Sequence, residues 1–179
     1  MIRLFVALPV PEDVTLGLNG MCSGLPGAKW VSPENYHLTL RFVGEVERGM
    51  ADDLDAALSQ ISAPAFDVTL TELGYFSRKD KVTSLIARAS KGDPLVHLQR
   101  KIESAAVRVG LGAEERKFKP HVTLARMKAG DPLETERFCV KTNFTTARDF
   151  RADRFILYSS FLSSSGAIYT PEVEYPLTA

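Results

Sequence analysis

The 179-residue sequence predicts an α+β fold, and we expect residues 1–179 to form a single domain. Short runs of alternating apolar and polar residues are typical of strands with one buried face. Segments with apolar residues three and four positions apart are typical of amphipathic helices. Both kinds of segment recur in two halves, and each half contains one His-x-Thr-Leu tetrapeptide. Duplication of a lobe is the economical explanation, although it depends on the motifs and the element order rather than on broad self-similarity.

In the first half, acidic residues favour the start of a helix near Glu12, and the Gly/Pro-rich residues 24–27 end it. Gly44 ends the first motif strand, and Leu54 and Leu58 have helical spacing. The expected elements are strands at 2–8 and 36–43, a brief pairing at 30–31, and helices at 12–23 and 48–61.

In the second half, clear alternation over 66–73 predicts a strand, and Asp93-Pro94 is a capping turn for a helix with an apolar face. The expected elements are a strand at 66–73, a turn at 75–77, a return strand at 81–89, a helix from 93 to about 109, the second motif strand at 119–126, a short helix at 133–138, and strands near 144, at 152–163 and at 167–175.

Two histidine motifs carry the functional prediction. Because strand side chains alternate, His37 must point the same way as Thr39, and His121 the same way as Thr123. Their apolar neighbours anchor the opposite, buried face. Each motif therefore presents an imidazole and a hydroxyl, and two copies suggest one site built from two halves.

Transfer at a phosphorus centre needs such a pair. A base removes a proton from the attacking hydroxyl or water while an acid protonates the leaving oxygen, and histidine serves both roles near neutral pH. Each proton transfer can contribute roughly a hundred- to ten-thousand-fold in rate. The hydroxyls of Thr39 and Thr123 can donate hydrogen bonds to the nonbridging phosphoryl oxygens.

The motifs and their surroundings resemble the 2H phosphoesterases, in particular the RNA 2′,3′-cyclic phosphodiesterase branch, which is also called 2′-5′ RNA ligase-like. The resemblance covers nearly the whole chain, and its strongest segments are 3–8, 29–46, 118–126, 157–160 and 166–169. It implies two pseudo-symmetric lobes of antiparallel sheet, with helices packed outside, that face each other across a central cleft.

The resemblance also implies an activity: hydrolysis of a terminal 2′,3′-cyclic phosphate on RNA to a 2′-phosphate, with reversal giving 2′-5′ ligation. It implies His37 as proton donor and His121 as proton acceptor, an order that the sequence itself leaves open. A phosphodiesterase for small cyclic nucleotides, and a non-catalytic RNA-end or nucleotide binder, use the same residues and remain alternatives.

Four further residues bear on the site. The resemblance places Arg126 near the phosphate, although strict alternation from His121 puts it on the opposite face unless a bulge rotates it. Arg41 has the same parity as His37 but reads equally well as a solvated rim residue. Phe76 is the candidate for stacking a base, although the Trp that relatives often carry in the following strand is absent. His97 has no Thr partner and is expected to be structural or exposed.

Composition limits the partners. The 22 basic and 22 acidic residues balance, so RNA must be bound locally, with the basic runs at 78–81 and 116–119 as candidate patches. The histidines lack the clustered carboxylates or cysteines of a metal site, so we expect no metal and no cofactor. Two cysteines without a secretory signal point to the cytoplasm. No membrane association is expected, and we expect a monomer.

Overall fold

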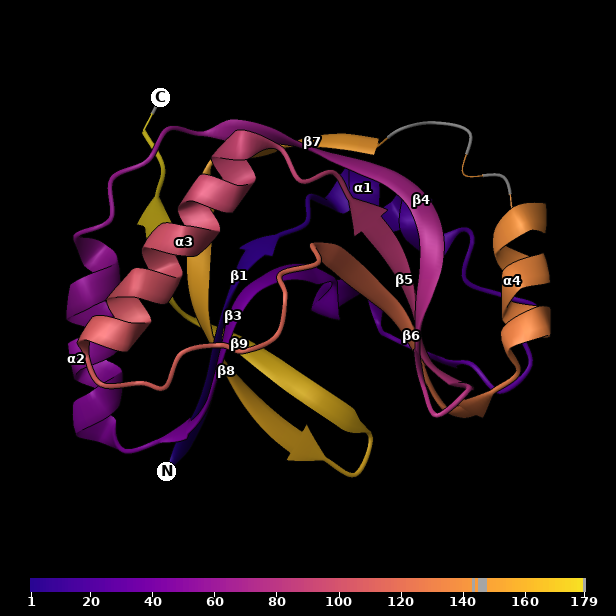
Figure 1. Ribbon diagram of the computed structural model, residues 1–179, viewed down its shortest axis with the longest axis horizontal. Helices are drawn as coiled ribbons and strands as arrows, with labels where there is room; N and C mark the ends of the chain where they lie inside the picture. Colours follow the sequence, from indigo (N-terminus) through magenta and orange to yellow (C-terminus); the bar gives the residue numbers. More distant parts are fainter. Residues whose placement is uncertain (143, 145–147, 179) are drawn as a thin grey trace.

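The computed structural model describes residues 1–142, 144 and 148–178 and contains one nine-stranded antiparallel sheet (Figure 1). The strand order is β7-β4-β5-β6-β3-β1-β8-β9, with β2 attached to β6. The strands are β1 (Ile2–Pro9), β2 (Lys29–Trp30), β3 (His37–Val46), β4 (Phe66–Arg78), β5 (Lys81–Ala89), β6 (His121–Gly130), β7 (Arg148–Ala152), β8 (Arg154–Ser163) and β9 (Gly166–Pro176).

The sheet has an internal two-fold pattern centred between β6 and β3. Moving outward from this centre, β5 corresponds to β1, β4 to β8, and β7 to β9. The two motif strands meet at the register pair Leu38↔Val122, which joins the halves into one sheet. The predicted α+β fold with two antiparallel lobes is therefore confirmed, and each lobe contributes its innermost strand to the centre.

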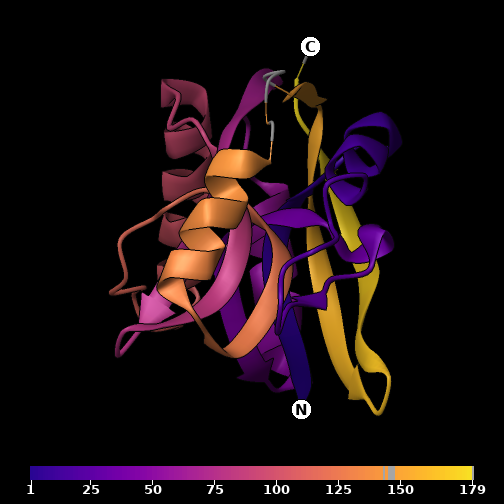
Figure 2. The same cartoon turned by 90° about the vertical axis from the view of Figure 1, so that its right-hand side faces the viewer.

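Helices cover the outside of both halves. They are α1 (Glu12–Asn19), the short 3₁₀ helix η1 (Pro33–Asn35), α2 (Arg48–Ser59), α3 (Asp93–Arg108) and α4 (Pro132–Lys141). The α3 helix packs on α2, β3 and β4, whereas α4 packs on β4 and β5. Figure 2 shows the strands between α3 on one side and α1 on the other. The buried residues of α3, including Leu98 and Ile102, share one hydrophobic core with Leu38 and Val122.

The hairpin turn between β4 and β5 lies later in the chain than the sequence suggested. The turn residues are Lys79 and Asp80, with φ angles of 49° and 59°, rather than residues 75–77. Two consecutive left-handed residues make a turn whose twist matches that of the flanking strands. The β4 strand consequently runs on to Arg78, and Phe76 is a strand residue rather than a turn residue.

Several other boundaries differ from expectation. Gly44 does not end the first motif strand: it adopts a φ of 85°, which glycine tolerates, and β3 continues to Val46. The first helix ends at Asn19, four residues early. The α4 helix extends to Lys141, and the Asp131 side chain caps it by accepting hydrogen bonds from two backbone N–H groups.

Two expectations in the second half also need correction. The α3 helix begins after Gly92, and no side chain of the described residues makes a capping hydrogen bond there. Asp93 therefore contributes its charge to the first turn but does not cap the helix. The strand expected near Phe144 falls mainly on residues outside the described part of the chain. Phe144 itself is in no strand, and β7 begins at Arg148.

Candidate active site

The two motifs face each other across the centre of the sheet. From the pair Leu38↔Val122, the antiparallel register sets His37 across from Thr123, and Thr39 across from His121. Each imidazole therefore has the hydroxyl of the other motif as its cross-strand neighbour, besides the hydroxyl of its own motif. The arrangement brings all four predicted residues to one face, around a local two-fold axis.

Each imidazole is oriented by an equivalent hydrogen bond to the backbone carbonyl two residues earlier. Nδ1 of His37 lies 2.7 Å from the carbonyl oxygen of Asn35, and Nδ1 of His121 lies 2.6 Å from that of Lys119. A carbonyl oxygen can only accept, so Nδ1 carries the proton in each neutral ring. Nε2 is then the nitrogen left to accept or donate a proton.

A β-bulge follows the threonine in both motifs. Thr39 and Arg41 pair with consecutive residues of β1, which leaves Leu40 as the extra residue. Thr123 and Ala125 pair with consecutive residues of β5, which leaves Leu124 extra in the same way. A bulge of this kind shifts the alternation by one position.

Each bulge turns the residues that follow it to the face opposite to the one that regular alternation predicts. Arg126, five positions after His121, is exposed on the histidine face, and its charge lowers the pKa of both His37 and His121. Phe42, five positions after His37, is likewise turned to this face and is 50% exposed. The bulge at Leu124 therefore turns Arg126 to the face of the predicted histidines, whereas regular alternation would put it on the opposite face.

Arg41 is not a solvated rim residue. It is only 8% exposed, and its Nε lies 2.5 Å from a carboxylate oxygen of Glu103 on α3. Its guanidinium also donates to the carbonyl oxygens of Phe42 and Gly112. The bulge at Leu40 turns this side chain to the buried face, where it ties β3 to α3 and to the loop before β6.

Aromatic rings enclose His37. Its ring centroid is 4.8 Å from that of Phe5 and 5.2 Å from that of Tyr169, which meets it edge to face, and Tyr158 lies at 6.3 Å. Burial of this kind disfavours the imidazolium and lowers the pKa of His37 to about 4; the charges of Arg126 and His121 act in the same direction. In the free protein, His37 is neutral at pH 7.

His121 lies in a more open environment. Phe76 contacts it edge to face, with ring centroids 4.8 Å apart, and the Lys119 ammonium is 6.0 Å from the centre of the Phe76 ring. Burial lowers the pKa of His121 as well, helped by the charges of Arg126 and Arg88. Phe76 thus flanks a candidate catalytic ring, and its role in stacking a base stays a prediction.

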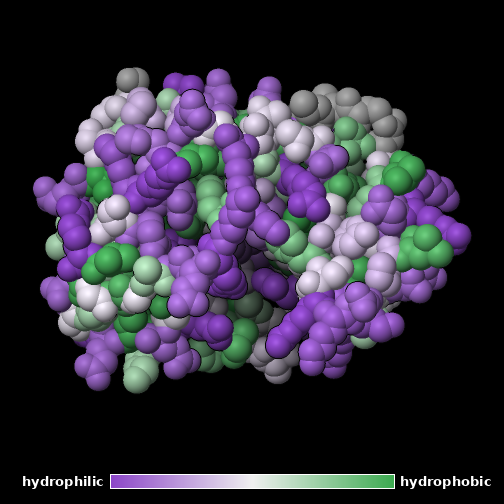
Figure 3. All heavy atoms as spheres, viewed as in Figure 1, coloured by the Kyte–Doolittle hydropathy of each residue, from purple (hydrophilic) through white to green (hydrophobic). Residues whose placement is uncertain are grey.

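A cleft of about 740 Å³ opens beside His121. Figure 3 shows a hollow near the centre of this face, with hydrophilic side chains gathered around it. The cleft contains members of both basic runs noted in the sequence. Its lining side chains come from β3, β4, α3, β6 and the loop before β6: Thr39, Leu40, Arg41, Phe42, Phe76, Ser77, Arg78, Gln99, Glu114, Arg116, Lys117, Phe118, Lys119 and His121.

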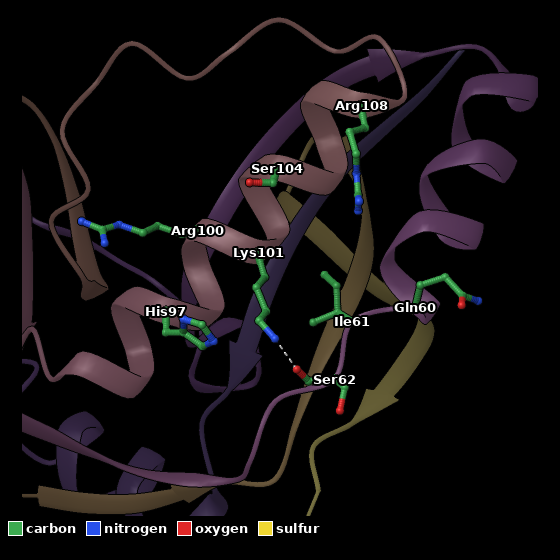
Figure 4. A pocket seen from close by; sticks show the side chains of 8 residues that line it. All are labelled: Gln60, Ile61, Ser62, His97, Arg100, Lys101, Ser104 and Arg108. Carbon is green, nitrogen blue, oxygen red and sulfur yellow. Dashed lines mark hydrogen bonds between the residues drawn. The ribbon is translucent and has the colours of Figure 1, made fainter.

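The third histidine lies elsewhere. His97 is exposed on α3 and lines a separate hollow of about 340 Å³ between this helix and the end of α2 (Figure 4). Lys101 reaches across this hollow and donates to the carbonyl oxygen of Ser62 at 2.6 Å. Among the residues that the structure describes, no threonine lines this hollow. Of the two expectations for His97, a structural or an exposed side chain, the structure shows the exposed one.

Neither a metal cluster nor a membrane-spanning helix occurs in the part of the chain that the structure describes. Among those residues, no three His, Cys, Asp or Glu side chains are grouped as metal ligands would be. Their helices are also too short or too polar to cross a bilayer.

Sequence reasoning missed several residues of this site. Regular alternation from His37 puts Phe42 on the buried face, and no sequence pattern indicates that Phe5, Tyr158 and Tyr169 enclose His37. One signal was present for Phe42, because it stands at the same offset from its histidine as Arg126. No sequence pattern indicated that β1, β8 and β9 would meet at His37.

Paired histidines and hydroxyls around a local two-fold axis, in a sheet with matching halves, define the class of two-histidine phosphoesterases. The LigT like Phosphoesterase family model matches this chain twice in succession, over residues 8–86 and 86–169. Each match contains one histidine motif, with His37 and β3 in the first and His121 and β6 in the second. The chain belongs to the LigT-like phosphoesterase family.

Similar proteins span nearly the same length. An RNA 2′,3′-cyclic phosphodiesterase of Thermotoga maritima is 33% identical over 173 residues, covering 93% of this chain and 91% of that protein. One from Escherichia coli K12 is 28% identical over 179 residues, covering 98% and 97%.

Solved structures agree. The structure of E. coli LigT complexed with 3′-AMP superposes with a TM-score of 0.80 at 26% identity, covering 99% of both chains. The Thermus thermophilus protein TT0787 superposes with a TM-score of 0.83 at 26% identity, covering 97% of both chains.

Proposed function

We propose that this protein hydrolyses the 2′,3′-cyclic phosphate at the end of an RNA or oligonucleotide to a 2′-phosphate. The observation that carries the proposal is the cross-strand pairing of two His/Thr sets around one axis, with Nε2 of each ring free to exchange a proton. The names of relatives that match over almost the whole chain support the substrate class. A single bilobal domain, residues 1–179, would contain the complete site.

In the proposed reaction, His121 and His37 act on opposite sides of the phosphorus. Nε2 of His121 takes a proton from water as the water oxygen bonds to phosphorus. The bond from phosphorus to O3′ breaks, and O3′ receives the proton from Nε2 of protonated His37. The ring opens to a 2′-phosphate, and proton exchange with solvent restores both histidines.

The assignment of roles follows the family resemblance, and it sets a requirement on the protonation of the two rings. The pKa of His37 is lowered to about 4 and that of His121 is lowered less strongly. In the free protein a single proton therefore favours His121, whereas the proposed reaction needs it on His37. A bound phosphate anion stabilises protonated His37, which makes the required protonation state accessible.

Thr39, Thr123 and Arg126 would hold the phosphate. The two hydroxyls flank the histidines from the same face, and the Arg126 guanidinium adds a positive charge beside both rings. Donors fixed where negative charge develops stabilise the transition state without reorganisation. Run in reverse, the same groups would join RNA ends through a 2′-5′ bond, although water in an open cleft favours hydrolysis.

The size of the cleft favours a polynucleotide end over a small cyclic nucleotide as the substrate. A volume of about 740 Å³ with several basic side chains accommodates more than one small cyclic nucleotide. Two cysteines, both free, fit a reducing compartment such as the cytoplasm, and we expect the protein to act as a monomer there.

The test of the proposed function is incubation of the purified protein, in EDTA, with a short RNA that ends in a 2′,3′-cyclic phosphate. We expect opening of the ring, because the proposed proton transfers need only the two imidazoles. Loss of turnover in EDTA, with recovery on adding a divalent metal, would count against this scheme. Tight binding without any turnover would favour the non-catalytic RNA-end binder.

The rate should depend on pH as a bell, with both limbs of kcat/KM at or below pH 6.5, because kcat/KM reports the pKa values of the free protein. Below the lower pKa, about 4, both imidazoles are protonated and no base remains. Above the upper pKa, both are neutral and no acid remains. Initial rates from acidic to mildly alkaline pH measure the profile, and a monotonic profile would contradict the two-histidine scheme.

A further inference from the structure

One exposed aromatic side chain in the cleft has no part in the proposed chemistry. Phe42 is 50% exposed because the bulge at Leu40 turns it to the histidine face. An aromatic ring that stays exposed to water forgoes the free energy that burial contributes, so a bound group that covers the ring is stabilised. Its position in β3 corresponds to that of Arg126 in β6. One side of the proposed phosphate site therefore presents an aromatic ring and the other side a guanidinium.

A guanidinium stands next to this ring. Cζ of Arg116 lies 6.0 Å from the centre of the Phe42 ring, and the Arg116 side chain is 74% exposed. Glu114 fixes it through two side-chain hydrogen bonds of 3.0 and 3.1 Å and accepts a third from the Arg116 backbone N–H at 3.0 Å. These bonds lower the pKa of Glu114 to about 2, so the carboxylate stays charged.

The loop that carries Arg116 is anchored to the rest of the fold. The backbone N–H of Glu114 donates to a carboxylate oxygen of Glu103 at 2.9 Å, and Glu103 also pairs with buried Arg41. Arg41 donates in addition to the carbonyl oxygen of Gly112. The buried ion pair therefore holds the loop against β3 and α3, and it sets Arg116 beside Phe42 before any substrate arrives.

We propose that Phe42 and Arg116 form a subsite for the nucleotide that precedes the cyclic phosphate end, with the base on the Phe42 ring and the linking phosphate near Arg116. This proposal rests on the proposed function. Base stacking on an aromatic ring is tolerant of sequence, and a guanidinium suits the phosphate that follows. The subsite would select RNA ends over small cyclic nucleotides.

The position of the subsite along the cleft determines how many nucleotides a substrate needs to reach it. Phe76 contacts His121, so in this proposal it faces the terminal nucleoside beside the reacting phosphate. Phe42 is three residues beyond Thr39, which is at most about 10 Å along the strand because the bulge at Leu40 shortens it. A mononucleotide at the histidines leaves the Phe42 ring uncovered, whereas a dinucleotide reaches it.

The test compares kcat/KM for a mononucleoside 2′,3′-cyclic phosphate with that for a dinucleotide ending in the same group. We expect the unmodified protein to prefer the dinucleotide by roughly tenfold or more, as stacking of one base allows. Phe42→Leu and Arg116→Gln should each remove most of this preference. Phe161→Leu is the matched control, because Phe161 is 67% exposed on β8 and does not line the cleft.

Equal kcat/KM values for the two substrates in the unmodified protein, or a preference that survives in both cleft variants, would overturn the subsite. Absence of turnover with either substrate would contradict the proposed function instead. In that case, the affinities for a nucleoside 2′-phosphate and a dinucleotide 2′-phosphate, measured by calorimetry with the same variants, still test the subsite through the same ratio.

Discussion

Replacement of either motif histidine, in His37→Ala or His121→Ala, is expected to lower kcat for a 2′,3′-cyclic phosphate by roughly a hundred- to ten-thousand-fold, because each variant loses one proton transfer. His97→Ala should turn over at nearly the unmodified rate, since this side chain lies exposed in a separate hollow. Single-turnover rates at the pH optimum of the unmodified protein measure the effect.

Loss of folding must be separated from loss of chemistry in this comparison. His37 packs among Phe5, Tyr158 and Tyr169, so its removal leaves a small cavity that can lower the free energy of unfolding by itself. His37→Gln retains much of the volume and serves as the second variant. A motif variant that unfolds at the same temperature as the unmodified protein and keeps more than about a tenth of its kcat would contradict a proton-transfer role.

A substrate whose leaving group needs no proton is expected to distinguish the acid from the base. A phosphodiester with a 4-nitrophenolate leaving group needs no proton on the departing oxygen. His37→Ala should therefore retain activity on this ester to within about tenfold, although its activity on the cyclic phosphate falls by the larger factor given above. His121→Ala should lose activity on both substrates, because the attacking water still requires a base.

The reverse pattern, in which His121→Ala is rescued by the aryl ester and His37→Ala is not, would exchange the roles of the two histidines. Equal losses for both variants on both substrates would show that the leaving oxygen is not protonated by either ring. The aryl ester also serves as its own control for folding, because a rescued variant must have an intact site.

Much of the site could be predicted because period-two alternation decides which strand residues share a face. His37 with Thr39, and His121 with Thr123, needed only this rule, and the buried partners Leu38 and Val122 follow from it. The register that brings the four together is a long-range pairing of β3 with β6, which no local pattern specifies.

The errors arose where local geometry departs from the regular strand. A bulge is set by how two strands fit together, so alternation alone exchanged the positions of Arg41 and Phe42 and placed Arg126 on the wrong face. The left-handed turn at Lys79 and Asp80 lacks the glycine that usually marks such a turn, and the hairpin was therefore placed early.

The most direct test of the central claim is hydrolysis of an RNA 2′,3′-cyclic phosphate in ¹⁸O-labelled water, with EDTA present and the product mapped. The account predicts one labelled oxygen in the phosphate and a product that ends in a 2′-phosphate with a free 3′-hydroxyl. A 3′-phosphate product, or a phosphate without label, would contradict attack of water on phosphorus with O3′ leaving between His121 and His37.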